Sequence, residues 1–142
     1  MILAALASTS VRPFFLRSQP GDRFCLLHAP AQQQQPHKGG IVYVHPFAEE
    51  MNKSRRMAAL QSRRLAALGY AVLQIDLFGC GDSSGDIADA DLDVWLRDLD
   101  AAAEWLAGQG HRPLYLWGLR LGALLAAAWS SQNRAGLAGL LL

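Results

Sequence analysis

Leu116-Trp117-Gly118-Leu119-Arg120-Leu121-Gly122-Ala123 is the stretch of this chain that decides its fold. A run of strand-forming residues ends at Trp117, and an Ala- and Leu-rich helix is expected to follow at once. The spacing of Gly118 and Gly122 is typical of a nucleophile elbow, Gly-x-Ser-x-Gly, a tight turn from strand to helix. Here Arg120 occupies the position of the serine. A guanidinium has no acceptor lone pair and stays protonated, so it cannot attack a carbonyl. The stretch therefore predicts the turn without its usual nucleophile.

The length, composition and charge of the chain are those of a globular protein. The chain has 142 residues, 51% hydrophobic and 18% charged, which is enough for one globular domain with a core. The net charge of +1 gives no electrostatic reason to expect a nucleic acid partner. Met1 to Ser10 has no basic segment before its short apolar run, and no run reaches the length of a membrane span, so we expect a cytoplasmic protein. Cys25 and Cys80 lack a metal-ligand spacing and are interpreted as free thiols, and no metal or cofactor is expected.

The pattern of apolar residues predicts strands that alternate with helices. The expected strands are Phe14–Leu16, Arg23–His28, Gly40–His45, Tyr70–Asp76, Leu114–Trp117 and Ala138–Leu142, and the expected helices are Asn52–Leu68, Asp91–Leu106 and Leu121–Ser131. This alternation is typical of a mostly parallel sheet with helices on both faces, the α/β class.

The first expected helix, Asn52–Leu68, carries both apolar and basic residues. Asn52 or Ser54 is a candidate N-cap, because a side-chain oxygen there can accept a hydrogen bond from the first turn. The larger apolar residues of this helix fall near one face, which we expect to be buried; they are Met57, Leu60, Leu65 and Leu68. Its many basic residues indicate a solvated face rather than a binding patch.

A glycine-rich loop follows the strand that ends at Asp76. Its sequence, Asp76-Leu-Phe-Gly79-Cys-Gly81-Asp-Ser83-Ser-Gly85, resembles a dinucleotide-binding fingerprint in part. That fingerprint needs a third small residue and an immediate helix N-terminus, and this loop does not open directly into a helix. Glycines that turn the chain, with local hydrogen bonds from Asp82 and Ser83, are the favoured interpretation.

In order along the chain, these pieces resemble an α/β-hydrolase. The resemblance rests on the loop after Ile41–Val44, the loop Asp76–Gly85 and the elbow Gly118–Gly122, and it covers about Phe14 to Leu142. It implies an α/β-hydrolase fold with a mostly parallel sheet. Residues 1–12 are then an N-terminal extension, and 13–142 form the N-terminal portion of the domain.

Two longer strings narrow the resemblance. Pro46-Phe-Ala-Glu-Glu-Met-Asn-Lys-Ser-Arg-Arg-Met57 and Leu116–Ala123 are similar to the hydrolase 2 family associated with exosortase A systems, which sort surface proteins and make extracellular polysaccharide. The resemblance implies that arginine is that family's own residue at the elbow. It implies no particular substrate.

The expected catalytic partners are missing from this chain. In α/β-hydrolases the acid and the histidine follow the nucleophile along the sequence. All four histidines here precede Arg120, and no Asp, Glu or His follows it. We therefore expect a C-terminally truncated fragment that is inactive alone. Its last strand, Ala138–Leu142, would present an uncharged apolar edge through which the fragment could self-associate.

Candidate site residues surround the elbow. Gly118 and Gly122 are structural, and the backbone N–H of Leu121 is a candidate oxyanion donor because it follows the central residue. His45 ends the strand where many esterases carry an oxyanion loop, and Phe47 would supply the N–H there because Pro46 has none. A hydrogen-bonded structural His45 is favoured over a site role.

Glu49 and Glu50 have two interpretations that the sequence leaves open. Either they complement the dipole of the following helix, or one of them pairs with Arg120 across the crevice. Two functions remain in view. The first is hydrolysis of ester- or acyl-type substrates by a protein with Arg120 at the nucleophile position. The second is a non-catalytic module in which Arg120 binds a carboxylate or phosphate.

Overall fold

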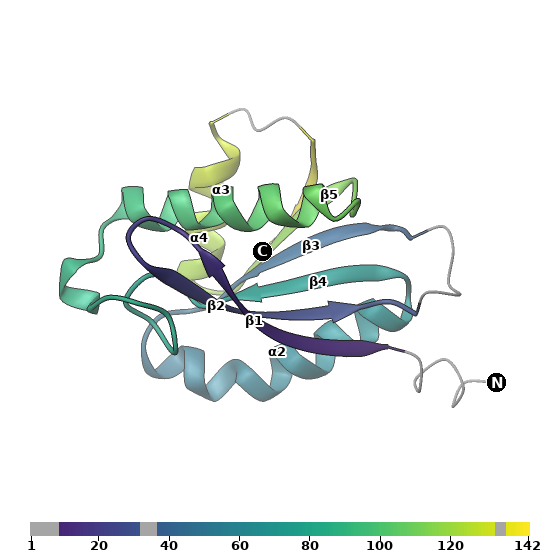
Figure 1. Cartoon of the computed structure of the whole chain (residues 1–142), viewed down its shortest axis with the longest axis horizontal. Helices are drawn as coiled ribbons and strands as arrows, with labels where there is room; N and C mark the ends of the chain where they lie inside the picture. The colour runs from purple at the N-terminus through teal and green to yellow at the C-terminus, as the bar shows by residue number, and fades with distance from the viewer. Residues whose placement is uncertain (1–8, 32–36, 133–135) are drawn as a thin grey trace.

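The computed structural model of the chain describes residues 9–31, 37–132 and 136–142 (Figure 1). Its centre is a six-stranded sheet with the strand order β1-β2-β4-β3-β5-β6. The strands are β1 (Ser10–Arg17), β2 (Asp22–Ala29), β3 (Gly39–Val44), β4 (Tyr70–Ile75), β5 (Leu114–Gly118) and β6 (Leu137–Leu141). The helices are α2 (Glu49–Ala67), α3 (Leu92–Gly108) and α4 (Leu121–Ser130), with a 3-10 turn η1 (Ile87–Asp89). β3, β4, β5 and β6 run parallel, and β1 and β2 form an antiparallel hairpin against β4.

Helices cover both faces of the sheet, as the alternation predicted. α3 and α4 lie on one face and α2 on the other (Figure 1). Beneath α3 and α4 lies the larger core, in which side chains such as Val42, Leu73, Leu99 and Leu125 are buried together. The smaller core under α2 contains Ile41 and Val72. β3 and β4 are buried on both faces, which explains their nearly continuous apolar sequences.

The strand order brings three loops to one edge of the sheet. β3 lies between β4 and β5, and Val44 is paired with both Ile75 and Gly118. The carboxyl ends of these three parallel strands therefore meet at a single edge, which we call the carboxyl edge. The predicted elbow, the His45 turn and the Asp76 loop all start from it, and ligands of open α/β sheets bind at this kind of edge.

The start of α2 corrects the sequence prediction. The helix begins at Glu49, with Ala48 as its N-cap and no side-chain capping hydrogen bond, rather than at Asn52 or Ser54. The hydroxyl of Ser54 donates instead to the carbonyl of Glu50, one turn earlier in the helix, at 2.7 Å. The helix can start early because a tight turn follows β3 at once. Glu49 and Glu50 thus lie inside the first turn, where acidic side chains complement the helix dipole.

The buried face of α2 also differs from the prediction. Met57, Leu60 and Leu68 are exposed, and the buried residues are Met51, Ala58, Ser62 and Ala66. The face toward the sheet carries mainly small side chains, which lets the helix lie close to β3 and β4. Ser62 is tolerated there because its hydroxyl accepts a 3.0 Å hydrogen bond from the side-chain amide of Gln74. Of the four predicted residues, Leu65 packs partly against the smaller core, so the spacing of large apolar residues identified only part of the buried face.

The two ends of the described chain are strands at opposite edges of the sheet. Met1 to Ser8 and residues 32–36, which contain the glutamine run, lie outside the described residues. β1 begins at Ser10, so the expected boundary between residues 12 and 13 falls inside a strand that is paired with β2. β6 pairs with β5, and Leu140, Leu141 and Leu142 are exposed. Self-association through them stays a prediction. Within the three described ranges, no helix combines the length and apolar character that crossing a bilayer requires.

Candidate functional site

The elbow forms around Arg120 as the sequence predicted. Arg120 is the N-cap of α4 and has φ 59° and ψ −119°, a left-handed conformation that is rare for a residue with a side chain. A Cβ on Gly118 would lie 2.5 Å from the Cα of Ala123, and one on Gly122 would lie 2.0 Å from the carbonyl oxygen of Val44. Both positions therefore require glycine. The backbone has the shape of a nucleophile elbow with an arginine at its apex.

The side chain of Arg120 extends from the carboxyl edge into solvent and is 72% exposed. Its Nε lies 3.9 Å from Oε2 of Glu50, so the structure brings these two predicted site residues together. Glu49 does not join them, because its carboxylate lies 3.9 Å from Nζ of Lys53 on the outer face of α2. Both pairs are largely exposed, and ion pairs of this kind contribute about 0 to 1 kcal/mol. Glu50 thus lies beside Arg120 but contributes little to holding the guanidinium in one position.

A second turn with the same backbone shape stands beside the first. Ala48, the N-cap of α2, has φ 52° and ψ −126°, within a few degrees of the values at Arg120. No local sequence pattern predicts this turn, because alanine does not favour positive φ. The two turns follow neighbouring strands, and the backbone N–H of Leu119 donates to the carbonyl of Val44 at 3.2 Å. Two strained helix starts therefore meet at the carboxyl edge.

His45 is buried, and both of its ring nitrogens form hydrogen bonds with backbone groups. It is 5% exposed, its Nδ1 lies 2.6 Å from the carbonyl oxygen of Pro46, and its Nε2 accepts a hydrogen bond from the backbone N–H of Leu77 at 3.1 Å. This pattern assigns the proton to Nδ1 and leaves neither nitrogen free. Burial lowers the pKa of His45, partly opposed by the hydrogen bond to Pro46. The neutral imidazole therefore connects the turn after β3 to the loop after β4 through hydrogen bonds, and it is not available as a base.

The two candidate oxyanion donors occupy the starts of the two helices. Leu121 is the first residue of α4, and Phe47 precedes the N-cap of α2. Backbone N–H groups at the start of a helix have no partner within it, and they point outward with the positive end of the helix dipole. These positions could stabilise developing negative charge beside Arg120.

The Asp76 loop is held by structural hydrogen bonds. Oδ2 of Asp76 accepts from Nη2 of Arg55 at 2.9 Å and from the backbone N–H of Asp82 at 3.1 Å. Ser83 donates to the carbonyl of Asp76 and accepts from the backbone N–H of Phe24. The loop then leads into η1 rather than directly into an α-helix. This geometry favours the structural interpretation of the glycines over dinucleotide binding.

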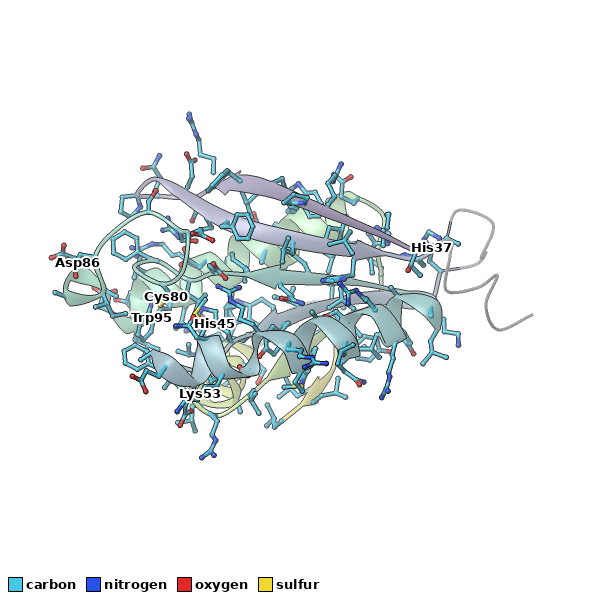
Figure 2. The ribbon with its side chains drawn as sticks, turned by 90° about the horizontal axis from the view of Figure 1, so that it is seen from below. His37, His45, Lys53, Cys80, Asp86 and Trp95 are labelled. Carbon is cyan, nitrogen blue, oxygen red and sulfur yellow. The ribbon has the colours of Figure 1, made fainter. Side chains whose placement is uncertain are left out.

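Both cysteines of the chain are buried thiols. Cys80 and His45 lie at the same end of the molecule, and His37 lies at the opposite end (Figure 2). Burial raises the pKa of the Cys80 thiol to about 11 and that of Cys25 to about 12, so both are protonated at neutral pH. In the part of the chain that the structure describes, no three His, Cys, Asp or Glu side chains lie together as metal ligands would.

Sequence reasoning missed two ion pairs close to the site, one of them partly buried and the other fully buried. Arg55, interpreted as part of a solvated face, reaches the buried Asp76. Arg23 and Asp98 are both fully buried, with Nε and Oδ1 2.8 Å apart, and Oδ2 of Asp98 accepts from the backbone N–H of Phe78. Asp98 lies on α3, and its bond to Phe78 joins this helix to the loop after β4. Its partner Arg23 is 75 residues away in sequence. No local pattern reveals such partners, because each pair forms only once the fold has assembled.

Comparison with protein families gives one match. The family described as serine aminopeptidase, S33, matches residues 35–142, which is most of the chain. No curated protein matches the chain in sequence.

Solved structures of hydrolases share the fold. Est1E from Butyrivibrio proteoclasticus, solved with ferulic acid, is 21% identical with a TM-score of 0.76 and is aligned over 89% of this chain and 50% of that protein. A soluble variant of monoglyceride lipase from Saccharomyces cerevisiae is 16% identical with a TM-score of 0.78, over 95% and 45%. XC6422 from Xanthomonas campestris, described as an α/β serine hydrolase without a lid, is 27% identical with a TM-score of 0.67, over 85% and 57%. The chain has the α/β-hydrolase fold and spans about half the length of these structures.

Proposed function

Because the chain belongs to the serine aminopeptidase S33 family, we propose that it is the N-terminal portion of a hydrolase-family protein that acts on ester- or acyl-type substrates. The observation that carries this proposal is the elbow itself. Arg120 stands at its apex with the elbow backbone and both glycines in place. The similar proteins named above include Est1E with bound ferulic acid and a monoglyceride lipase, which supports an acyl substrate class.

The chain alone should not hydrolyse its substrate. Arg120 cannot be a nucleophile, His45 has both ring nitrogens engaged, and Cys80 is protonated. Loss of a triad nucleophile costs on the order of 10⁶ in kcat. The guanidinium is instead suited to bind the carbonyl oxygen or the anionic group of a substrate at the carboxyl edge.

We also propose a cellular setting. The strings Pro46–Met57 and Leu116–Ala123 resemble the hydrolase 2 family of exosortase A systems; the first starts just after β3, and the second includes the end of β5. This supports a cytoplasmic role beside surface-protein sorting or exopolysaccharide synthesis. Deletion of the gene in a host with such a system, followed by analysis of exported polysaccharide and sorted surface proteins, tests the setting. Unchanged export of both would contradict it.

Restoring the serine tests the enzymatic proposal. Arg120→Ser, and the equivalent change in a longer homologue with the same elbow arginine, are assayed with 4-nitrophenyl butyrate. We expect no turnover from the chain itself in either form, and a gain in the longer homologue, where the rest of a catalytic apparatus can be supplied. Turnover by the unmodified chain, free of host esterase, would overturn the proposed role of Arg120. No gain in the homologue favours the second candidate.

The second candidate is a non-catalytic anion-binding module. It is favoured by a cavity of about 260 Å³ in which two cations and one carboxylate meet. The cavity is lined by Pro46, Glu50, Lys53, Ser54, Leu119 and Arg120. A carboxylate or phosphate would compete with Glu50 for the exposed guanidinium. Titration with acetate and with inorganic phosphate, comparing the chain with Arg120→Gln, measures this directly; equal binding by both would contradict it.

A further inference from the structure

A second cavity lies on the other side of the first turns of α2. It has a volume of about 370 Å³ and is lined by Phe47, Ala48, Met51, Asn52, Gly79, Cys80, Gly81 and Ile87. None of these side chains carries a charge, and Asn52 supplies the single polar side-chain group besides the Cys80 thiol. The cavity beside Arg120 is lined by positions 50, 53 and 54 of α2, whereas this one is lined by positions 48, 51 and 52. The start of α2 therefore separates a charged cavity from an apolar one.

Residues outside the apolar cavity pack against its lining residues and form hydrogen bonds with the adjoining loop. The ring of Phe47 packs edge-on against Trp95 with centroids 6.1 Å apart, and Nε1 of Trp95 donates to the carbonyl of Phe78 at 3.0 Å. Gly79 and Gly81 have positive φ and present backbone rather than side chains to the cavity. A Cβ on Gly81 would lie 2.1 Å from Oδ2 of Asp76, so that part of the wall rests on the Asp76–Arg55 pair. These contacts form the cavity before any ligand arrives.

The chemistry of the lining restricts what can bind. The raised pKa of Cys80 keeps its thiol uncharged, and Met51 is buried against the floor. Phe47 and Ile87 are 40% and 41% exposed, which gives the opening an apolar rim. A charged group placed here would lose hydration without gaining a charged side chain as a partner. The volume lies within the range of about 300 to 1,000 Å³ typical of small-molecule sites, and it is too small to admit a helix about 10 Å across.

We propose that this cavity binds an uncharged alkyl or aryl group of the substrate. Phe47 and Ala48 belong to the turn that carries a candidate oxyanion donor, so a carbonyl held at that turn would have one substituent within reach of the cavity. In naming the occupant as part of a substrate, the inference rests on the proposed hydrolase function. The binding of a hydrocarbon group does not, because it requires no chemistry at Arg120.

The test uses methionine methyl groups as reporters. With ¹³C-methyl methionine incorporated, Met51 reports on the cavity wall, while the exposed Met57 lies further along α2 and outside the cavity. The 142-residue chain is titrated with 1-hexanol and followed by NMR. We expect a saturable shift of the Met51 methyl signal and a much smaller shift at Met57.

Substitutions of Ile87, at the opening of the cavity, test whether hexanol binds there. Ile87→Asp should weaken hexanol binding about tenfold or more, because the carboxylate opposes transfer of the alkyl chain into the cavity. Ile87→Val should bind within about twofold of the parent chain. Leu60→Asp makes the same change at an exposed α2 residue away from the cavity and should leave binding unchanged. A cooperative urea-unfolding transition, measured before titration, checks that each variant is folded.

The outcomes separate the two proposals. Equal shifts at Met51 and Met57, or equal binding by the parent chain and Ile87→Asp, would overturn the cavity proposal as non-specific partitioning. Hexanol binding that follows the expected pattern supports it even if Arg120→Ser never yields turnover. A failed esterase test combined with specific hexanol binding would therefore remove the catalytic proposal and leave the hydrocarbon site standing.

Discussion

The turn at Ala48 and the turn at Arg120 have nearly the same backbone and opposite surroundings. Both are N-caps of helices that follow neighbouring parallel strands, with φ near 55° and ψ near −120°. Ala48 faces an uncharged cavity beneath Phe47, whereas Arg120 extends into solvent beside Glu50. The comparison teaches that the elbow shape is set by what surrounds the apex, not by the residue at the apex. An arginine can replace a nucleophile there without loss of the fold.

The two turns are held by different means. At the Arg120 turn, Gly118 and Gly122 allow backbone to approach backbone, and Leu119 donates to Val44. At the Ala48 turn no glycine is present, and the buried His45 ties Pro46 to Leu77 with its two ring nitrogens. One turn thus depends on close backbone packing and the other on a neutral side chain. Substitutions can test each mechanism separately.

The largest effect is expected from Gly122→Ala. The added Cβ would meet the carbonyl oxygens of Val44 and His45 at 2.0 and 2.6 Å, so α4 or β3 must move. We expect a loss of at least about 3 kcal/mol in the free energy of unfolding, measured by urea denaturation. Gly108→Ala is the matched control, because a Cβ there meets nothing within 4 Å in α3, and it should stabilise by about 0.5 to 1 kcal/mol. A small effect at Gly122 would show that the elbow does not need its glycines.

The next effect concerns His45 and pH. Burial lowers the pKa of His45 in the folded chain, whereas the unfolded chain titrates near pH 6.5. Below that pH the unfolded state binds a proton at His45 and the folded state does not. The contribution of His45 to the free energy of unfolding is therefore complete above about pH 6.5 and falls as the pH drops toward the folded pKa. The slope for one histidine is at most about 1.4 kcal/mol per pH unit.

A variant isolates this contribution. His45→Asn should lose less stability than the parent chain between pH 7.5 and 5.5, by about 1 kcal/mol in urea denaturation at each pH. The remaining pH dependence includes His28 and His111, whose pKa values burial also lowers. Identical pH profiles for parent and variant would mean that the Ala48 turn does not rely on a neutral imidazole.

Sequence reasoning reached the Arg120 turn and missed the Ala48 turn for a physical reason. Gly118 and Gly122 are required by contacts that any elbow makes, so their spacing is a local signal. Ala48 has no such signature, because its strain is imposed by β3, α2 and His45 acting together. The same holds for α2, whose small buried residues were less visible than Met57 and Leu60. The parallel sheet and its strand positions were predictable because buried strands are apolar throughout, whereas Arg23–Asp98 and Arg55–Asp76 depend on tertiary assembly.

A smaller effect is expected from Ala48→Gly. Positive φ with ψ near −120° costs a residue with a Cβ about 1 to 3 kcal/mol, and glycine removes this strain while losing about 0.5 to 1 kcal/mol in chain entropy. We expect a net stabilisation of about 1 kcal/mol by thermal or urea denaturation. Ala59→Gly, in the regular part of α2, should instead destabilise by about 1 kcal/mol. If both changes destabilise equally, the strain at Ala48 is not real and the likeness of the two turns is only geometric.

The smallest effect is expected from removing the one ion pair at the apex of the Arg120 turn. Glu50→Gln keeps the size of the side chain and removes its charge at 3.9 Å from the guanidinium, and Glu49→Gln removes a charge from the same first helical turn beside Lys53. Both variants lose the same favourable interaction with the helix dipole and one exposed ion pair each, so their difference compares the contact with Arg120 against the contact with Lys53. Because Arg120 and Glu50 are mostly exposed, we expect this difference to stay below about 0.5 kcal/mol and to vanish in 0.5 M salt. A double-mutant cycle with Arg120→Gln measures the same coupling independently. A coupling above about 1 kcal/mol would mean that Glu50 holds the guanidinium firmly, and an anionic ligand would then have to displace it before binding.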